Sequence, residues 1–195
     1  MRVGDVVLTV LRPESPAALI DEDAFARDEF LPYWAELWPA ATSLAAVLPD
    51  AAGLAVVELG CGLGVPSLVA AARGAHVTAT DWAEDAVELL RKNAERNDLE
   101  LTAEQRDWRE PWPARFDLAL AADVLYERRN VEPLVERLSQ LAPVSLLALA
   151  GRPYERTFLD AWPGRRADIA DRVVRLTPPG EHGGSADHKH EAGDA

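Results

Sequence analysis

A glycine-rich turn offers the clearest chemistry in this 195-residue sequence. It contains Glu58, Gly60, Cys61, Gly62 and Gly64, in the run ELGCGLG between an apolar stretch and an alanine-rich one. Glycines let a backbone turn tightly and approach a ligand, and amides at a helix start donate hydrogen bonds to anionic groups. No histidine motif accompanies Cys61, so we interpret it as a small side chain at a crowded turn. A tight turn without a ligand is the alternative.

The spacing of the glycines, together with the acidic residues around them, indicates which ligand the turn could bind. A dinucleotide-binding turn needs GxGxxG or GxGxxA, whereas this run is GxGxG and Val65 takes the third position of that pattern. An acid at Glu58 also disfavours a pyrophosphate. Asp81 is placed to accept both hydroxyls of a ribose, and Asp107 the exocyclic amine of an adenine with Trp108 against the ring. S-adenosylmethionine combines ribose and adenine with positive charge and no phosphate, so it fits these acids better than NAD does.

Alternating strands and helices must position these residues. Apolar runs predict buried strands at residues 54–59, 76–80, 101–105, 116–122 and 144–150. Proline starts and apolar residues at helical spacing predict helices at residues 39–48, 66–73, 83–96, 131–141 and 158–162. A short N-terminal strand or arm at 6–11 and one late strand near 169–176 complete the pattern. Near-continuous apolar strands are typical of a parallel sheet with helices on both faces, so the predicted fold class is α/β.

Composition and charge exclude several classes of partner. Lys and Arg total 20 against 33 Asp and Glu, a net charge of -13, and the arginines are scattered among acids. Nucleic acids and anionic membranes are bound through basic patches, so neither is expected as a partner. The single Cys61 excludes an internal disulfide framework and fits a reducing compartment. No apolar run reaches the ~18 residues of a membrane span, and Asp5, Arg12 and Pro13 interrupt any signal-peptide core. A cytoplasmic protein is expected.

The length fits one domain. Residues 1–177 are expected to form it, with an N-terminal arm and helix (1–50), a cofactor-binding core (54–150) and a C-terminal helix and strand (151–177). From residue 178 the composition turns to Gly, His, Asp, Glu and Ala, which predicts a disordered tail over 178–195. Its histidines are interpreted as solvated rather than as metal ligands, so no metal site is expected. A monomer is expected.

These motifs together resemble the seven-stranded, Rossmann-like S-adenosylmethionine-dependent methyltransferases. The resemblance rests on ELGCGLG, on Asp81 at the end of VTATD, and on the pair Asp107 and Trp108. It implies a doubly wound, mostly parallel seven-stranded sheet. It also implies that the cofactor contacts Trp38, Glu58, Gly60, Cys61, Gly62, Gly64, Asp81, Trp82, Asp107 and Trp108.

Two further stretches narrow the resemblance. WAELWPAA, at residues 34–41, and the run from Asp123 to Tyr126 are similar to the WP-type helix start and the [DE]xxY motif of the seven-stranded protein lysine methyltransferases. Together with GRP at residues 151–153, they resemble the branch that methylates lysine on the electron transfer flavoprotein β subunit and its bacterial relatives. The resemblance covers roughly residues 30–165 and implies that Asp123 and Tyr126 lie beside the transferred methyl group.

Methyl transfer to an amine needs neither a protein nucleophile nor a metal. The nitrogen must be uncharged and held about 3–3.5 Å from the methyl carbon. We expect Asp123 to orient or deprotonate this amine and Tyr126 to wall its slot or accept a hydrogen bond. The structural alternative is that Asp123 caps the following turn and Tyr126 packs against the sheet.

Several functions stay open at this point. A protein lysine is the predicted acceptor, and a small amine of the nicotinamide type is the alternative that the motifs do not separate. A non-catalytic module that keeps the cofactor pocket is a second alternative. An NAD-dependent oxidoreductase is disfavoured by Val65 and Asp107. A nucleic-acid adenine methyltransferase is disfavoured because the prolines of its [DN]PP[YF] turn are missing and the charge is wrong.

Overall fold

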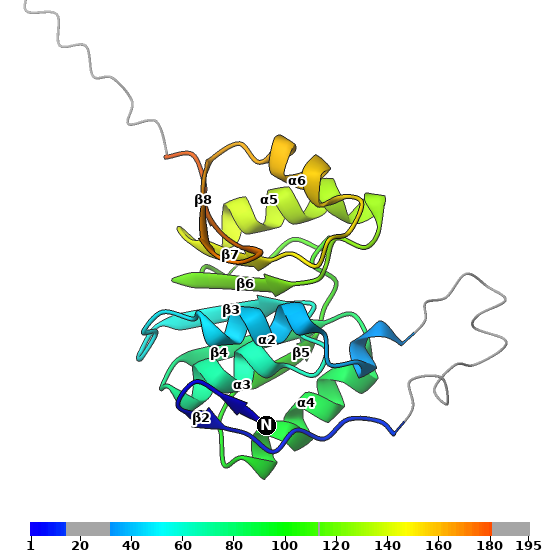
Figure 1. Ribbon diagram of the computed structural model, residues 1–195, viewed down its shortest axis with the longest axis vertical. Coiled ribbons are helices and arrows are strands. Elements are labelled where there is room, and N and C mark those ends of the chain that lie inside the picture. Colours follow the sequence, from blue (N-terminus) through cyan, green and yellow to red (C-terminus); the bar gives the residue numbers. More distant parts are fainter. Residues whose placement is uncertain (15–31, 113, 181–195) are drawn as a thin grey trace, which may run out of the picture.

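A seven-stranded sheet organises the chain in the computed structural model, which describes residues 1–14, 32–112 and 114–180 (Figure 1). The strand order is β5-β4-β3-β6-β7-β9-β8. Neighbours from β5 to β7 run parallel, whereas β9 is antiparallel to both β7 and β8. The strands are β3 (Ala55–Leu59), β4 (His76–Asp81), β5 (Thr102–Gln105), β6 (Leu118–Ala122), β7 (Ser145–Ala148), β8 (Arg165–Ala170) and β9 (Val173–Thr177). The predicted α/β fold with a mostly parallel, doubly wound sheet is confirmed.

Helices cover both faces of the sheet because its central strands are apolar on both sides. The helices are α2 (Pro39–Ala46), α3 (Val65–Ala72), α4 (Glu84–Arg96), α5 (Val131–Leu141) and α6 (Glu155–Ala161). Val56 of β3 packs in one core with Leu44 of α2 and Leu90 of α4. Its neighbour Val57 points to the opposite face and packs in a second core with Leu134 of α5. Figure 1 shows α5 and α6 together, apart from α2, α3 and α4.

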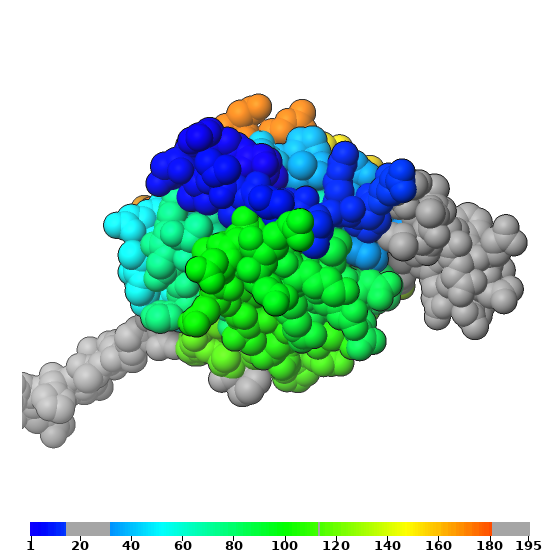
Figure 2. Space-filling model, turned by 90° about the horizontal axis from the view of Figure 1, so that it is seen from below, coloured from blue at the N-terminus to red at the C-terminus, as the bar shows by residue number. Residues whose placement is uncertain are grey.

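The N-terminal segment forms a hairpin and then runs along α4. Strands β1 (Arg2–Val3) and β2 (Val6–Val7) pair antiparallel, so the strand expected over residues 6–11 is shorter than predicted. Beyond it, the backbone amides of Thr9 and Leu11 donate to the side chains of Asn97 and Asn93, at 2.8 and 2.6 Å. The two asparagine side chains thus accept the hydrogen bonds that the backbone of a neighbouring strand would otherwise accept. Figure 2 shows this blue segment lying across the green surface that includes α4.

The C-terminal part corrects one prediction. A single strand was expected near residues 169–176, but the structure has two strands, β8 and β9, joined by a turn at Arg172 with φ of 56°. Strand β8 is almost wholly exposed at the sheet edge, so its sequence lacks the apolar alternation that signals a strand. The acidic stretch at 21–29 and most of the tail, 181–195, lie outside the described residues.

Candidate active site

A cavity of about 700 Å³ opens where the central parallel strands end. Its walls come from the segments after β3, β4, β5, β6 and β7 and from residues 33–38, which precede α2. Ligands of open α/β sheets bind at this carboxyl edge, and the volume is within the usual range for small-molecule sites. Nine of the ten predicted cofactor residues line it: Trp38, Glu58, Gly60, Cys61, Gly62, Gly64, Asp81, Trp82 and Trp108.

The glycine turn connects β3 to α3 with a backbone that other residues rarely adopt. Gly60, Gly62 and Gly64 have φ of 65°, 50° and 70°. A Cβ on Gly62 would lie 3.2 Å from the carbonyl oxygen of Trp34, so the turn also lets residues 33–38 pack directly against it. The turn therefore forms the floor of the cavity, and residues 33–38, which we call the roof segment, lie over it.

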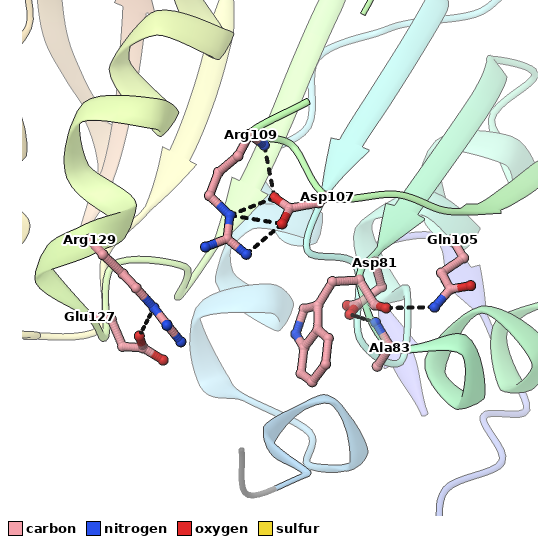
Figure 3. Close-up of polar contacts among 8 residues, drawn as sticks. Asp81, Ala83, Gln105, Asp107, Arg109, Glu127 and Arg129 are labelled. Atoms are coloured by element: carbon pink, nitrogen blue, oxygen red, sulfur yellow. Dashed lines mark hydrogen bonds and ion pairs between the residues drawn. The ribbon is translucent and has the colours of Figure 1, made fainter. Parts of the chain in front are cut away.

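Two buried acids, Glu58 and Asp81, face the cavity from β3 and β4. Glu58 accepts hydrogen bonds from the backbone amide of Ser67, at 2.9 Å, and from its hydroxyl. Asp81 accepts from the amides of Gly62 and Ala83, at 2.9 and 3.0 Å; Figure 3 shows the second of these bonds. Burial raises the pKa of both carboxyls, that of Glu58 to about 8. A cationic ligand would favour their charged forms, so the site fits positive charge. Ser67, one turn into α3, carried no recognisable signal in the sequence.

The raised pKa of Glu58 predicts that the free protein loses stability as pH rises. Its folded pKa of about 8 lies above the ordinary 4.5, so its contribution is complete below pH 4.5 and is lost as pH rises toward 8. Relative to Glu58→Gln, the free energy of unfolding of the natural protein should fall by about 2–4 kcal/mol between pH 5 and 8. Urea unfolding of both proteins across this range measures the difference. A constant difference would contradict a neutral Glu58.

Asp107 lies outside the cavity wall, unlike its neighbour Trp108. Its carboxylate accepts hydrogen bonds from the backbone amide and the guanidinium of Arg109, with distances of 2.8 and 2.9 Å from Oδ1 to N and Nε (Figure 3). Its pKa is lowered, mainly by this side-chain bond. The indole ring of Trp108 does line the cavity, and its buried nitrogen has no hydrogen-bond partner within the described residues. Trp108 thus lines the cavity, while Asp107 lines a small pocket of about 50 Å³ that shares Trp82, Trp108 and Tyr126 with it.

Asp123 is held by an ion pair that links two strand ends. Its Oδ1 and Oδ2 accept from Nε and Nη2 of Arg152, at 2.6 and 2.7 Å, and its side chain is 3% exposed. Asp123 follows β6 with φ of 56°, while Arg152 follows β7 and stacks over the Trp38 ring at 5.1 Å. With both oxygens engaged, Asp123 is less suited to taking a proton and better suited to fixing Arg152 and the roof segment. The importance of Arg152 was missed because its partner is 29 positions away.

Removing Arg152 should destabilise the protein more than removing an exposed arginine nearby. Arg152→Met leaves the buried carboxylate of Asp123 without its partner, which should cost about 2–3 kcal/mol of unfolding free energy. Arg156→Met is the matched control, since Arg156 pairs with Asp160 on the surface of α6 and should cost less than about 0.5 kcal/mol. Equal losses in urea unfolding would argue against a structural ion pair at Asp123.

Tyr126 closes the cavity opposite the turn. Its ring lies 5.4 Å from that of Tyr33 in the 3-10 helix η2 (Tyr33–Ala35), which begins the roof segment. Burial raises the pKa of Tyr126 to about 12, so its hydroxyl stays protonated at neutral pH and is available to donate a hydrogen bond. The indole nitrogen of Trp38 donates to the carbonyl of Tyr33 at 2.7 Å, which fixes the roof segment just before Pro39 starts α2.

Comparison with solved structures gives the fold independently. The structure matches the T. thermophilus 16S rRNA methyltransferase RsmC in complex with AdoMet and guanosine, with a TM-score of 0.61 and 23% identity, over 74% of this chain and 44% of that one. It matches magnesium protoporphyrin IX methyltransferase from Synechocystis PCC 6803 with a TM-score of 0.57 and 21% identity, over 71% and 76% of the two chains. The chain therefore has the Rossmann-like methyltransferase fold.

Sequence comparison gives the family. The chain is 36% identical over 138 residues to protein N-lysine methyltransferase METTL21A of Mus musculus, covering 63% of this chain and 62% of that protein. It is 34% identical over 121 residues to the METTL21A of Danio rerio, covering 55% of each. The chain thus spans about three fifths of the length of these curated relatives. A family profile described as lysine methyltransferase matches residues 35–160, and the chain belongs to this family.

Proposed function

We propose that the protein is an S-adenosylmethionine-dependent N-methyltransferase that acts on a lysine side chain of another protein. The observation that carries this proposal is the cavity at the carboxyl edge of the sheet, with its glycine floor and the buried Asp81 at the end of β4. Family membership supports the lysine acceptor, and the two solved structures of this fold described above were both determined with S-adenosylmethionine bound.

The lining residues fit a cationic nucleoside. Asp81 offers carboxylate oxygens to ribose hydroxyls, and its burial beside Glu58 favours a ligand that brings positive charge. Trp82 and Trp108 offer apolar surface for an adenine ring, and the unpartnered indole nitrogen of Trp108 offers a donor. When bound, S-adenosylmethionine supplies an electrophilic methyl group and departs as S-adenosylhomocysteine.

The protein's own part in the reaction is to position a neutral amine and to exclude water. Tyr126 and Tyr33 form one wall of the slot, and the hydroxyl oxygen of Tyr126 orients the neutral amine by accepting a hydrogen bond from one of its N–H groups, which leaves the lone pair free to face the methyl carbon. Asp123 acts as a positioning residue, since it holds Arg152, which in turn stacks on Trp38 of the roof segment. No described group of three or more His, Cys, Asp or Glu side chains could hold a metal ion.

The acceptor class has one alternative, a small amine such as a nicotinamide-like molecule. Incubating a cell lysate with methyl-labelled S-adenosylmethionine and the enzyme separates the two. We expect label in a protein band, whereas label confined to the small-molecule fraction would favour the alternative. A protein that binds S-adenosylhomocysteine but labels neither fraction would fit a non-catalytic module.

We further propose that the protein belongs to the branch that acts on the electron transfer flavoprotein β subunit. We also propose that it is a cytoplasmic monomer with no nucleic-acid partner. None of the helices in the described parts of the chain is long and apolar enough to cross a membrane. Methyl labelling of purified electron transfer flavoprotein would support membership of this branch. If a lysate protein were labelled but the purified flavoprotein were not, the result would count against it.

A further inference from the structure

Five carboxylates line the cavity, and four of them already have partners. Glu58 bonds Ser67, Asp81 bonds the amides of Gly62 and Ala83, and Asp123 pairs with Arg152. The fourth, Glu127, forms an ion pair with Arg129. The fifth is Glu36 of the roof segment, whose carboxylate has no hydrogen bond or ion pair with any described residue.

The fold holds Glu36 in the middle of the roof segment. It follows η2 in extended conformation, with φ of -99° and ψ of 144°, and its backbone amide bonds the carbonyl of Tyr33. Two residues before it, Trp34 lies against Gly62 of the floor, and two residues after it, Trp38 lies under Arg152. Both sides of Glu36 are thus anchored to the turns that follow separate strands. The backbone at Glu36 is therefore held in place, and its half-buried side chain lines the cavity.

Charge and ring chemistry define what this carboxylate can bind. An unpaired, half-buried carboxylate attracts a cation more strongly than an exposed one, because the effective dielectric constant is lower. The ring of Tyr33, three residues before Glu36, lies 5.4 Å from that of Tyr126, and both line the cavity, whereas the Trp38 ring is already covered by the guanidinium of Arg152. Aromatic faces add attraction for ammonium groups. An alkylammonium, the charged end of a lysine side chain, meets these conditions.

We propose that Glu36 is a specificity-determining residue that captures the charged amine of the methyl acceptor at the cavity. This inference rests on the proposed function and adds the group that favours a charged amine. A pairing carboxylate favours the protonated amine, whereas transfer requires the neutral one. Glu36 therefore serves capture, and the nitrogen loses its proton to solvent before it reaches the methyl group.

The test measures amine binding without any turnover. Protein saturated with S-adenosylhomocysteine is titrated with n-butylammonium, a mimic of the lysine side chain, and binding is followed by calorimetry. Glu36→Gln should weaken n-butylammonium binding about tenfold, as expected for the loss of one charge-assisted bond at a half-exposed site. Glu36→Asp should recover part of the loss. The exposed Glu100→Gln, which makes the same charge change away from the cavity, should bind as the natural protein does.

Three outcomes would overturn the proposal. They are unchanged n-butylammonium binding in Glu36→Gln, no saturable binding to the natural protein, and weaker S-adenosylhomocysteine binding with amine binding intact. The last would mean that Glu36 pairs with the cofactor's own ammonium. Failure of the natural protein to bind S-adenosylhomocysteine would count against the proposed function instead, and the amine titration of the free protein would still decide the role of Glu36.

Discussion

Asp81→Ala is expected to weaken S-adenosylhomocysteine binding roughly a hundredfold while leaving the protein folded. Two hydrogen bonds from ribose hydroxyls to a carboxylate contribute about 3 kcal/mol together, which corresponds to this factor. Stability should change little, because two effects oppose each other. The substitution removes the bonds to Gly62 and Ala83, but it also removes a carboxyl whose burial disfavours its charged form.

Calorimetric titration measures this effect against two reference variants. Asp85→Ala makes the same charge change four residues later, on the exposed first turn of α4, and should leave the affinity unchanged. Asp123→Ala should mainly lower turnover, since Asp123 holds Arg152 beside the roof segment. Equal loss of cofactor affinity in Asp81→Ala and Asp123→Ala would contradict this division of roles.

Gly64→Ala is expected to lower the free energy of unfolding by about 3 kcal/mol. Gly64 has φ of 70°, where a Cβ costs about 1–2 kcal/mol. The new Cβ would also lie 2.3 Å from Cδ1 of Leu90, a fully buried side chain of α4, and overpacking of this kind costs about 1–3 kcal/mol. For a protein of this size, the loss corresponds to a decrease in Tm of about 6–12 °C.

Gly53→Ala separates the two causes. Gly53 has nearly the same φ, 73°, but a Cβ there would have nothing within 4 Å. It should therefore lose only the backbone contribution, about 1–2 kcal/mol. If thermal unfolding showed the same loss of stability for both variants, the contact with Leu90 would not contribute to the cost of a side chain at position 64.

The sequence predicts the central sheet well, and it also predicts which residues line the cavity at the sheet's carboxyl edge, because local patterns determine both. The helix at 131–141 has the predicted bounds, and the strand predicted at 76–80 ends one residue later, at Asp81. In a parallel sheet, residues at strand ends converge at one edge, so Asp81 and the glycine turn could be placed together without coordinates. The apolar character of each strand followed from burial on both faces.

The remaining features depend on contacts between distant positions. Asp123 forms an ion pair with Arg152, which follows the next strand, and the Tyr126 ring packs against Tyr33, which lies 93 positions earlier. Neither contact can be recognised from a local sequence pattern. Asp107 occupies its expected place after β5, where its carboxylate pairs with Arg109, only two residues later. Neither that ion pair nor the missing partner of Glu36 can be read from spacing.

Lysine methylation by this protein is tested most directly by identifying the amino acid that receives the methyl group. Lysate proteins labelled from methyl-labelled S-adenosylmethionine are hydrolysed and separated, with Asp81→Ala as the enzyme control. We expect label in methylated lysine when the natural protein is added and little label with the variant. Label in another amino acid, or equal labelling by the natural protein and Asp81→Ala, would contradict this expectation.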